Sequence, residues 1–130
     1  MKIFFIKSLL LCFFTFSSVG GDIIEEISSS FQAGNTKEIS AYFASTINLS
    51  ILNDSNVYSK VQAEIILNSF LNAHEPRSAK IIHRLNNSPS YKHAVIELGT
   101  SKGNFRVSYS LRVDNDKAQI VELRIEKAVE

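Results

Sequence analysis

The sequence predicts an α+β domain in which three helices pack on an antiparallel sheet. Apolar residues recur at helical spacing in the first half of the chain, and from Ser78 onward they alternate with polar residues at a period of two. The strands of the second half follow one another closely, so the simplest topology is a meander in which each strand pairs with the next. The 130 residues are enough for one such domain, at residues 21–130.

Two helices are predicted at the start of this domain. Asp22 can cap the first, because Glu25 stands three residues later, and Gly34 ends it. Thr36 is predicted to cap a second, short helix. The apolar residues assigned to these two helices are Ile23, Ile24, Ile27, Phe31, Ile39, Tyr42 and Phe43.

A short strand and a third helix follow. Residues 47–52 alternate between apolar and polar side chains, which predicts a strand. Ser59 and Gln62 form a capping box for the third helix, and Pro76 closes the region. The apolar residues assigned to this helix are Val61, Ile65, Ile66 and Phe70.

Four strands are predicted in the second half, at residues 78–86, 91–101, 104–114 and 118–127. A two-residue turn at Lys102 and Gly103 and a three-residue turn at residues 115–117 place apolar residues together on one face. The neighbours predicted on this face are Leu98 with Val107, Ile96 with Tyr109 and Ile81, Ala94 with Leu111 and His83, Val121 with Leu111, Leu123 with Tyr109, and Ile125 with Val107.

The opposite face of the predicted sheet carries charges of both signs. Lys80, Glu97, Ser108 and Arg124 are predicted to lie in one row, with Arg106 beside Glu126 and Ser110 beside Glu122. Interleaved charges are typical of a face in contact with water, and cross-strand pairs add only about 0.2–1 kcal/mol each. The apolar face therefore receives the helices, and any pocket is expected between the two layers.

Residues 1–20 have the three-part pattern of a secretory signal peptide. Lys2 and Lys7 precede an apolar run from Leu9 to Phe16, and small residues follow this run up to Gly20. The apolar run is shorter than the ~20 residues that span a bilayer. Export to the periplasm or outside the cell, with cleavage after Gly20 or Gly21, is the prediction; a retained N-terminal anchor is the alternative.

Cysteine content and charge exclude several classes of protein. The single cysteine, Cys12, lies in the predicted signal peptide, so the mature chain would have neither a disulfide nor a thiol nucleophile. Loss of Lys2 and Lys7 changes the net charge from +1 to −1, which excludes a generally basic surface for nucleic acid. Residues 22–76 carry a net charge of −5 and residues 77–127 a net charge of +5. This distribution favours mutual attraction of the two halves, and an anion-binding patch on the second half is the alternative.

Four stretches resemble known proteins. "FQAGNTKEISAYFASTINLSI" resembles the opening of the nuclear transport factor 2-like, or cystatin-like, superfamily. "YSKVQAEIILNSFLNAHEP", "IIHRLNNSPSYKHAVIELGTSKGNFRVSYSLR" and "IVELRIEK" resemble a family of small exported bacterial proteins of unknown function. The resemblance covers residues 22–128 and implies a cone, formed by a curved sheet around the helices. It implies no activity, because the superfamily includes isomerases, dehydratases, ligand carriers and scaffolds without activity.

Enzymes of that superfamily generally use Asp, His or Tyr inside the cone. No carboxylate stands at a position predicted to point inward, so acid–base catalysis by a pair of carboxylates has no candidate residues here. His83 and Tyr109 are the only inward candidates for acid–base work, and each is also typical of a core position. The residues predicted to line the cone and bind a ligand are His83, Ile96, Thr100, Tyr109 and Leu123.

Metal, cofactor and anion sites are weakly indicated. His74, His83 and His93 stand on different elements with no paired-ligand spacing, so neither a metal site nor a cofactor is predicted. Arg84, His93 and Arg112 are predicted to form one row on the outer face, which is the best candidate anion site in the chain. The alternative for this row is a solvated basic patch.

Three functions are consistent with these observations. The first is a non-catalytic protein of the cell envelope that binds a small apolar ligand or another envelope protein. The second is a structural scaffold that forms a homodimer, and the third is an enzyme that uses His83 and Tyr109. No membrane span is predicted after processing.

Overall fold

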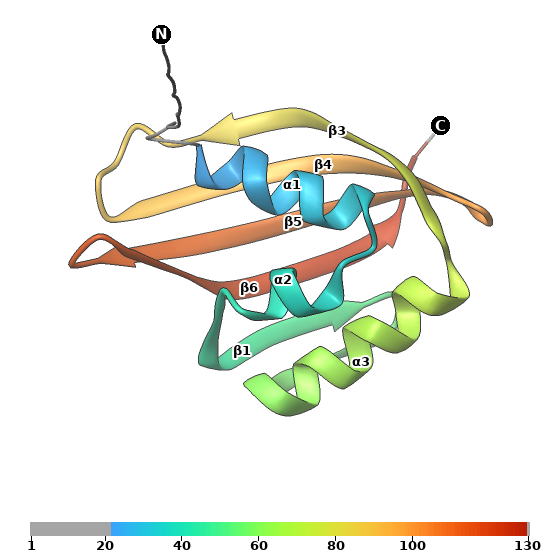
Figure 1. Ribbon diagram of the computed structural model, residues 1–130, viewed down its shortest axis with the longest axis horizontal. Coiled ribbons are helices and arrows are strands. Elements are labelled where there is room, and N and C mark those ends of the chain that lie inside the picture. Colours follow the sequence, from blue (N-terminus) through green and yellow to red (C-terminus); the bar gives the residue numbers. More distant parts are fainter. Residues whose placement is uncertain (1–21, 130) are drawn as a thin grey trace, which may run out of the picture.

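The computed structural model describes residues 22–129 and shows three helices on one face of a six-stranded sheet (Figure 1). The predicted signal peptide, residues 1–20, lies outside the described residues. The elements are α1 (Ile23–Gln32), α2 (Thr36–Ser40), β1 (Phe43–Ile51), β2 (Asp54–Ser59), α3 (Lys60–Ala73), β3 (Pro76–Leu85), β4 (Tyr91–Thr100), β5 (Gly103–Asp114) and β6 (Lys117–Lys127).

The strand order across the sheet is β2-β1-β6-β5-β4-β3. The predicted antiparallel meander of β3, β4, β5 and β6 is confirmed. β1 lies parallel to β6, and β2 continues the sheet beyond β1 as an antiparallel edge. The sheet curves, and α1 and α2 lie across its concave side in Figure 1.

The helices begin close to the predicted caps. The side chain of Asp22 accepts a hydrogen bond from the Ile24 backbone N–H, and that of Ser59 accepts one from Gln62. The second helix is capped by Asn35, not by Thr36, because the Asn35 side chain accepts from the Glu38 N–H. The helix ends at Ser40, and β1 begins three residues later, at Phe43.

The first strand is longer than predicted and has an unpredicted partner. β1 starts at Phe43 instead of residue 47, so Phe43 packs into the core from a strand. β2 was missed because its sequence, "DSNVYS", is polar and mostly exposed, which leaves no clear alternation to detect. Pairing with β1 is what makes this segment a strand.

The buried face of α3 also differs from the predicted stripe. Ala63, Leu67, Phe70 and Leu71 face the core, whereas Val61 and Ile65 are 67% and 64% exposed. The helix is apolar on more than one side, so its sequence did not identify the inner face by itself.

The turn between β4 and β5 lies at Ser101 and Lys102, one residue before the predicted place. Leu98 therefore pairs with Phe105, Ile96 with Val107, and Ala94 with Tyr109. The pairing slides by two residues, and a slide of two keeps every side chain on its predicted face. On the outer face, the same slide replaces the predicted row by Lys80, Glu97, Arg106 and Glu126.

The turn between β5 and β6 combines a tight hairpin with a bulge. Asn115 and Asp116 both have positive φ, as in a two-residue type I′ turn, and not the predicted three-residue turn. The predicted pair of Tyr109 with Leu123 is confirmed, but a register shift after Ser110 brings Ile120 opposite Leu111 in place of Val121. The predicted pair of Ser110 with Glu122 and that of Arg106 with Glu126 also form.

The core fills the space between the sheet and the helices. Ile27, Phe31, Leu67, Leu111 and Leu123 are fully buried in one cluster. Among residues 22–129, no helix has the length and apolar character needed to cross a membrane.

Candidate functional site

A bulge in β3 decides which side chains face the helices. Ile81 pairs with Ile96 as predicted, but Ile82 has no partner and the next pair joins His83 to Val95. One extra residue in a strand reverses the faces of all residues that follow. His83 therefore lies on the outer face of the sheet and does not line the cone, contrary to prediction.

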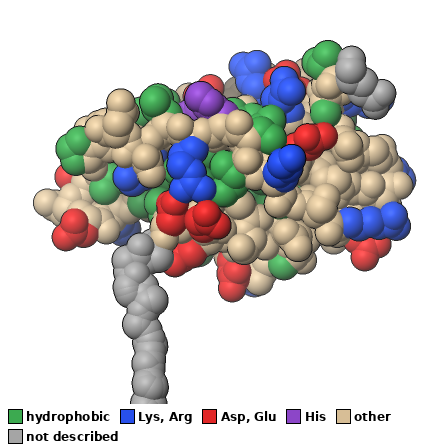
Figure 2. Space-filling model, turned by 90° about the horizontal axis from the view of Figure 1, so that it is seen from above, with side chains coloured by type: hydrophobic (Ala, Val, Ile, Leu, Met, Phe, Trp, Pro, Cys, Tyr) green, Lys and Arg blue, Asp and Glu red, His purple; other side chains and the backbone are tan. Residues whose placement is uncertain are grey.

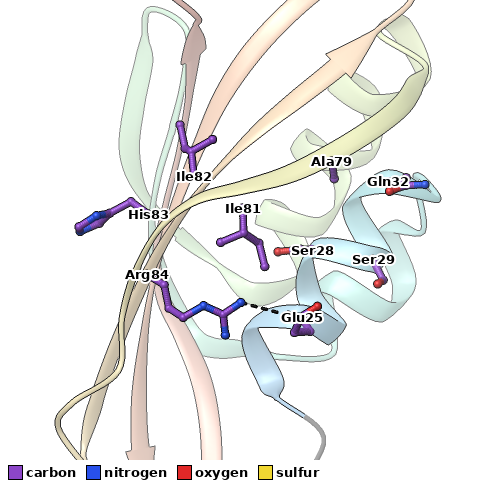
Figure 3. Close-up of a pocket in the computed structure, with 9 residues that line it drawn as sticks. All are labelled: Glu25, Ser28, Ser29, Gln32, Ala79, Ile81, Ile82, His83 and Arg84. Carbon is purple, nitrogen blue, oxygen red and sulfur yellow. Dashed lines mark hydrogen bonds and ion pairs between the residues drawn. The ribbon is translucent and has the colours of Figure 1, made fainter.

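Arg84 takes the inward place that was predicted for His83. It pairs with Ala94 and reaches α1, where its guanidinium contacts the carboxylates of Asp22 and Glu25. The bond from Arg84 Nη2 to Glu25 Oε2 is 3.1 Å long. Figure 3 shows Arg84 pointing toward α1 and His83 pointing away from it. The predicted anion site of Arg84, His93 and Arg112 therefore does not assemble.

The other predicted lining residues are packed inside the domain. Ile96, Tyr109 and Leu123 are 0% exposed and Thr100 is 9% exposed. The Tyr109 hydroxyl is buried against α1: it donates to the Ile24 carbonyl at 2.9 Å and lies 3.0 Å from Ser28 Oγ. Burial raises the pKa of Tyr109 to about 12. These residues form a core rather than the wall of an open cone.

A groove of about 620 Å³ runs along the surface between α1 and β3 (Figure 3). Its floor includes Ile81 and Ala79, which are half-buried and packed against the core. Seen from above, apolar atoms are exposed on this side between charged side chains of both signs (Figure 2). The groove is lined by Glu25, Ser28, Ser29 and Gln32 of α1 and by Ala79, Ile81, Ile82, His83 and Arg84 of β3.

β3, which forms one wall of this groove, is an edge strand. Within residues 22–129 it pairs with β4 alone, so the backbone N–H and C=O groups of its other edge have no strand partner. Register irregularities follow Pro76 and Ile81, which limits the regular edge to Ser78–Ile81. The opposite edge of the sheet, β2, is six mostly exposed residues.

The outer face carries a polar cluster that the sequence did not predict. Ser110 is 3% exposed, and its hydroxyl lies 2.9 Å from His93 Nδ1 and accepts from the Tyr91 hydroxyl at 3.1 Å. A histidine beside a serine can act as the general base that activates the serine hydroxyl as a nucleophile, but that hydroxyl must be accessible to the substrate. Because only 3% of Ser110 is exposed, its hydroxyl is not accessible to a substrate.

Residues 22–129 contain no group of three or more His, Cys, Asp or Glu side chains placed to hold a metal ion. Of the arrangements that are present, the groove between α1 and β3 combines volume, exposed backbone groups, apolar surface and charge.

Comparisons with known proteins agree with this architecture. Residues 24–126 match a family described as Domain of unknown function (DUF4783). A crystal structure of a DUF4783 family protein from Bacteroides uniformis is 28% identical, with a TM-score of 0.78 over 84% of this chain and 100% of the other. No curated protein matches the chain.

Two more distant structures show the same fold. A domain of unknown function with a cystatin-like fold, from Nostoc punctiforme, has a TM-score of 0.65 at 9% identity over 87% of this chain and 81% of its own. A design named "Rd1NTF2_04 with long sheet" has a TM-score of 0.63 at 15% identity over 78% of this chain and 94% of its own. The fold is therefore the cystatin-like, nuclear transport factor 2-like one.

Proposed function

The chain belongs to the DUF4783 family, a family of unknown function, and we propose that it is an exported, non-catalytic domain that binds an extended segment of another envelope protein. The observation that carries the proposal is the free edge of β3 beside the groove that α1 closes on its other side. A filled core argues against the alternative of a small apolar ligand held inside the cone.

The proposed mode of binding is strand addition. An extended peptide gains backbone hydrogen bonds from the edge of β3, and its alternate side chains enter the groove toward α1. The regular edge of Ser78–Ile81 is four residues long, which suits a short segment. Bulges and basic residues such as Lys80 are devices that prevent unlimited edge-to-edge pairing, so they favour a short segment over an open-ended sheet.

The groove also indicates the chemistry of the partner. Ala79 and Ile81 offer an apolar floor between the two walls, which favours an apolar side chain on the peptide. At the end nearest the start of α1, Asp22 and Glu25 carry two negative charges against the one positive charge of Arg84. A lysine or arginine of the peptide is therefore favoured at that end.

Substitution of Ser29 tests the groove directly. Ser29 is an exposed residue of α1 that lines the groove, so Ser29→Trp fills the groove without entering the core. Linear peptides selected against the wild-type domain from a displayed random library are expected to bind Ser29→Trp at least about tenfold more weakly, a loss of ~1.4 kcal/mol. Isothermal titration calorimetry with synthetic peptides measures the difference.

Ser69→Trp is the matched control for this experiment. Ser69 is an exposed serine of α3, outside the groove, and this variant is expected to bind the peptides like the wild type. Both variants are expected to unfold within about 0.5 kcal/mol of the wild type. Equal binding by wild type and Ser29→Trp would rule out the groove as the peptide site.

The proposal that the protein is exported is based on the signal-peptide pattern of residues 1–20, and it is tested separately. The intact mass of the protein recovered from the bacterial envelope is expected to correspond to a chain that begins near Gly21 or Asp22, since signal peptidase cuts after small residues. A protein that retains residues 1–16 would show that this segment is an anchor and not a cleaved signal.

A further inference from the structure

A pair of histidines lies on the outer face of the sheet, on the side away from α1. The bulge at Ile82 brings His83 to this face, and His93 stands on the neighbouring strand β4. The centroids of the two imidazole rings are 6.5 Å apart, with an angle of 63° between the ring planes. In the sequence these residues are ten positions apart on separate strands, and without the bulge they would lie on opposite faces.

Within residues 22–129, the His93 ring has a hydrogen-bond partner at Nδ1 and none at Nε2. Its Nδ1 lies 2.9 Å from the hydroxyl of Ser110, which is almost fully buried and is itself bonded by Tyr91 at 3.1 Å. Metal-binding histidines are typically oriented in this way, through a hydrogen bond at the nitrogen that does not bind the metal. Nε2 of His93 is then the nitrogen available for a ligand.

We propose that His83 and His93 bind one divalent first-row transition metal ion of the kind that prefers imidazole, namely Cu²⁺, Ni²⁺ or Zn²⁺. A metal lies about 2.0–2.1 Å from each nitrogen that binds it, so the two rings have to move closer together. His83 is exposed, and a rotation of its side chain can supply this movement while His93 stays fixed. Water fills the remaining coordination positions.

The charged residues that line the cleft beside His93 have no net charge, so they neither strengthen nor oppose the binding of a cation. Glu122 and Arg124 line a cleft of about 210 Å³ with His93, and their charges are opposite in sign. The site thus has two protein ligands and a neutral pair of neighbours, which predicts a reversible site and not a permanent structural one. His83 also lines the peptide groove, so the two sites share this residue, whereas His93 lies on the outer face of the sheet.

Titration of the untagged domain with Zn²⁺ followed by calorimetry is the test. One equivalent of Zn²⁺ is expected to bind, and His83→Asn or His93→Asn is expected to weaken binding at least about tenfold. Ser110→Ala is expected to weaken it by about tenfold as well, because the His93 ring loses its anchor. Two nitrogen ligands are expected in the electron paramagnetic resonance spectrum of the Cu²⁺ complex.

His74→Asn is the matched control, because His74 lies at the end of α3, stacked on Phe70 and bonded to its carbonyl. This variant is expected to bind the metal like the wild type. Absence of Zn²⁺ and Cu²⁺ binding by the folded wild-type domain would overturn the proposal. It would equally be overturned if the His83 and His93 variants, shown to be folded by circular dichroism, bound as tightly as the wild type.

Discussion

Replacement of Leu111 by alanine is expected to lower the free energy of unfolding by about 2–5 kcal/mol. Leu111 is 0% exposed and lies on the face of β5 that the helices cover. Its truncation removes buried methyl and methylene groups and leaves a cavity that the packed surroundings can fill only in part. Urea unfolding followed by circular dichroism measures the loss.

Two variants on the outer face serve as controls for Leu111→Ala. Leu85 is 42% exposed on β3, so Leu85→Ala makes the same chemical change at a position that is much less buried than Leu111. Ser108→Ala on β5 is expected to stay within about 0.5 kcal/mol of the wild type. Equal losses at positions 85, 108 and 111 would show that the faces of the sheet are assigned wrongly.

Alkaline pH is expected to destabilise the protein through Tyr109. The folded protein raises the pKa of this phenol from 10.0 to about 12 by burial, so the unfolded chain loses the proton first as pH rises. The contribution of the protonated Tyr109 to the free energy of unfolding is fully present below pH 10 and is lost progressively between pH 10 and about 12. Two pKa units correspond to about 2.7 kcal/mol of unfolding free energy.

Tyr109→Phe isolates this contribution. The variant lacks the titrating hydroxyl together with its bonds to the Ile24 carbonyl and Ser28, so its stability at neutral pH is expected to fall by about 1–2 kcal/mol. Between pH 10 and 12, however, its stability is expected to fall less steeply than that of the wild type. Parallel pH profiles for the two proteins would show that Tyr109 does not titrate in this range.

The sequence predicted the classes of most elements because they follow from local patterns. The caps at Asp22 and Ser59 are formed by neighbours three residues apart or fewer. Alternation identified the inward faces of β4 and β5, and these assignments survived a two-residue error in the turn between them. Such an error changes the partners of Phe105 and Val107 but leaves them buried.

The candidate site depended on features that alternation does not reveal. The bulge at Ile82 exchanges the faces of His83 and Arg84, and nothing in the residues around it marks an extra position, because no glycine or proline stands there. The groove arises from long-range packing of α1 beside β3, and β3 is an edge only because β1 inserts beside β6 instead. These are tertiary relationships, which no local window of sequence contains.

The most direct test of strand addition at β3 is amide hydrogen exchange of the domain, measured by NMR with and without a saturating library-selected peptide. Strand addition predicts slower exchange at those backbone amides of Ser78–Ile81 that point to the edge of β3 away from β4, with cross-strand contacts between these residues and the peptide backbone. Slowed exchange confined to α3 or to the outer face, with the edge of β3 unchanged, would contradict it.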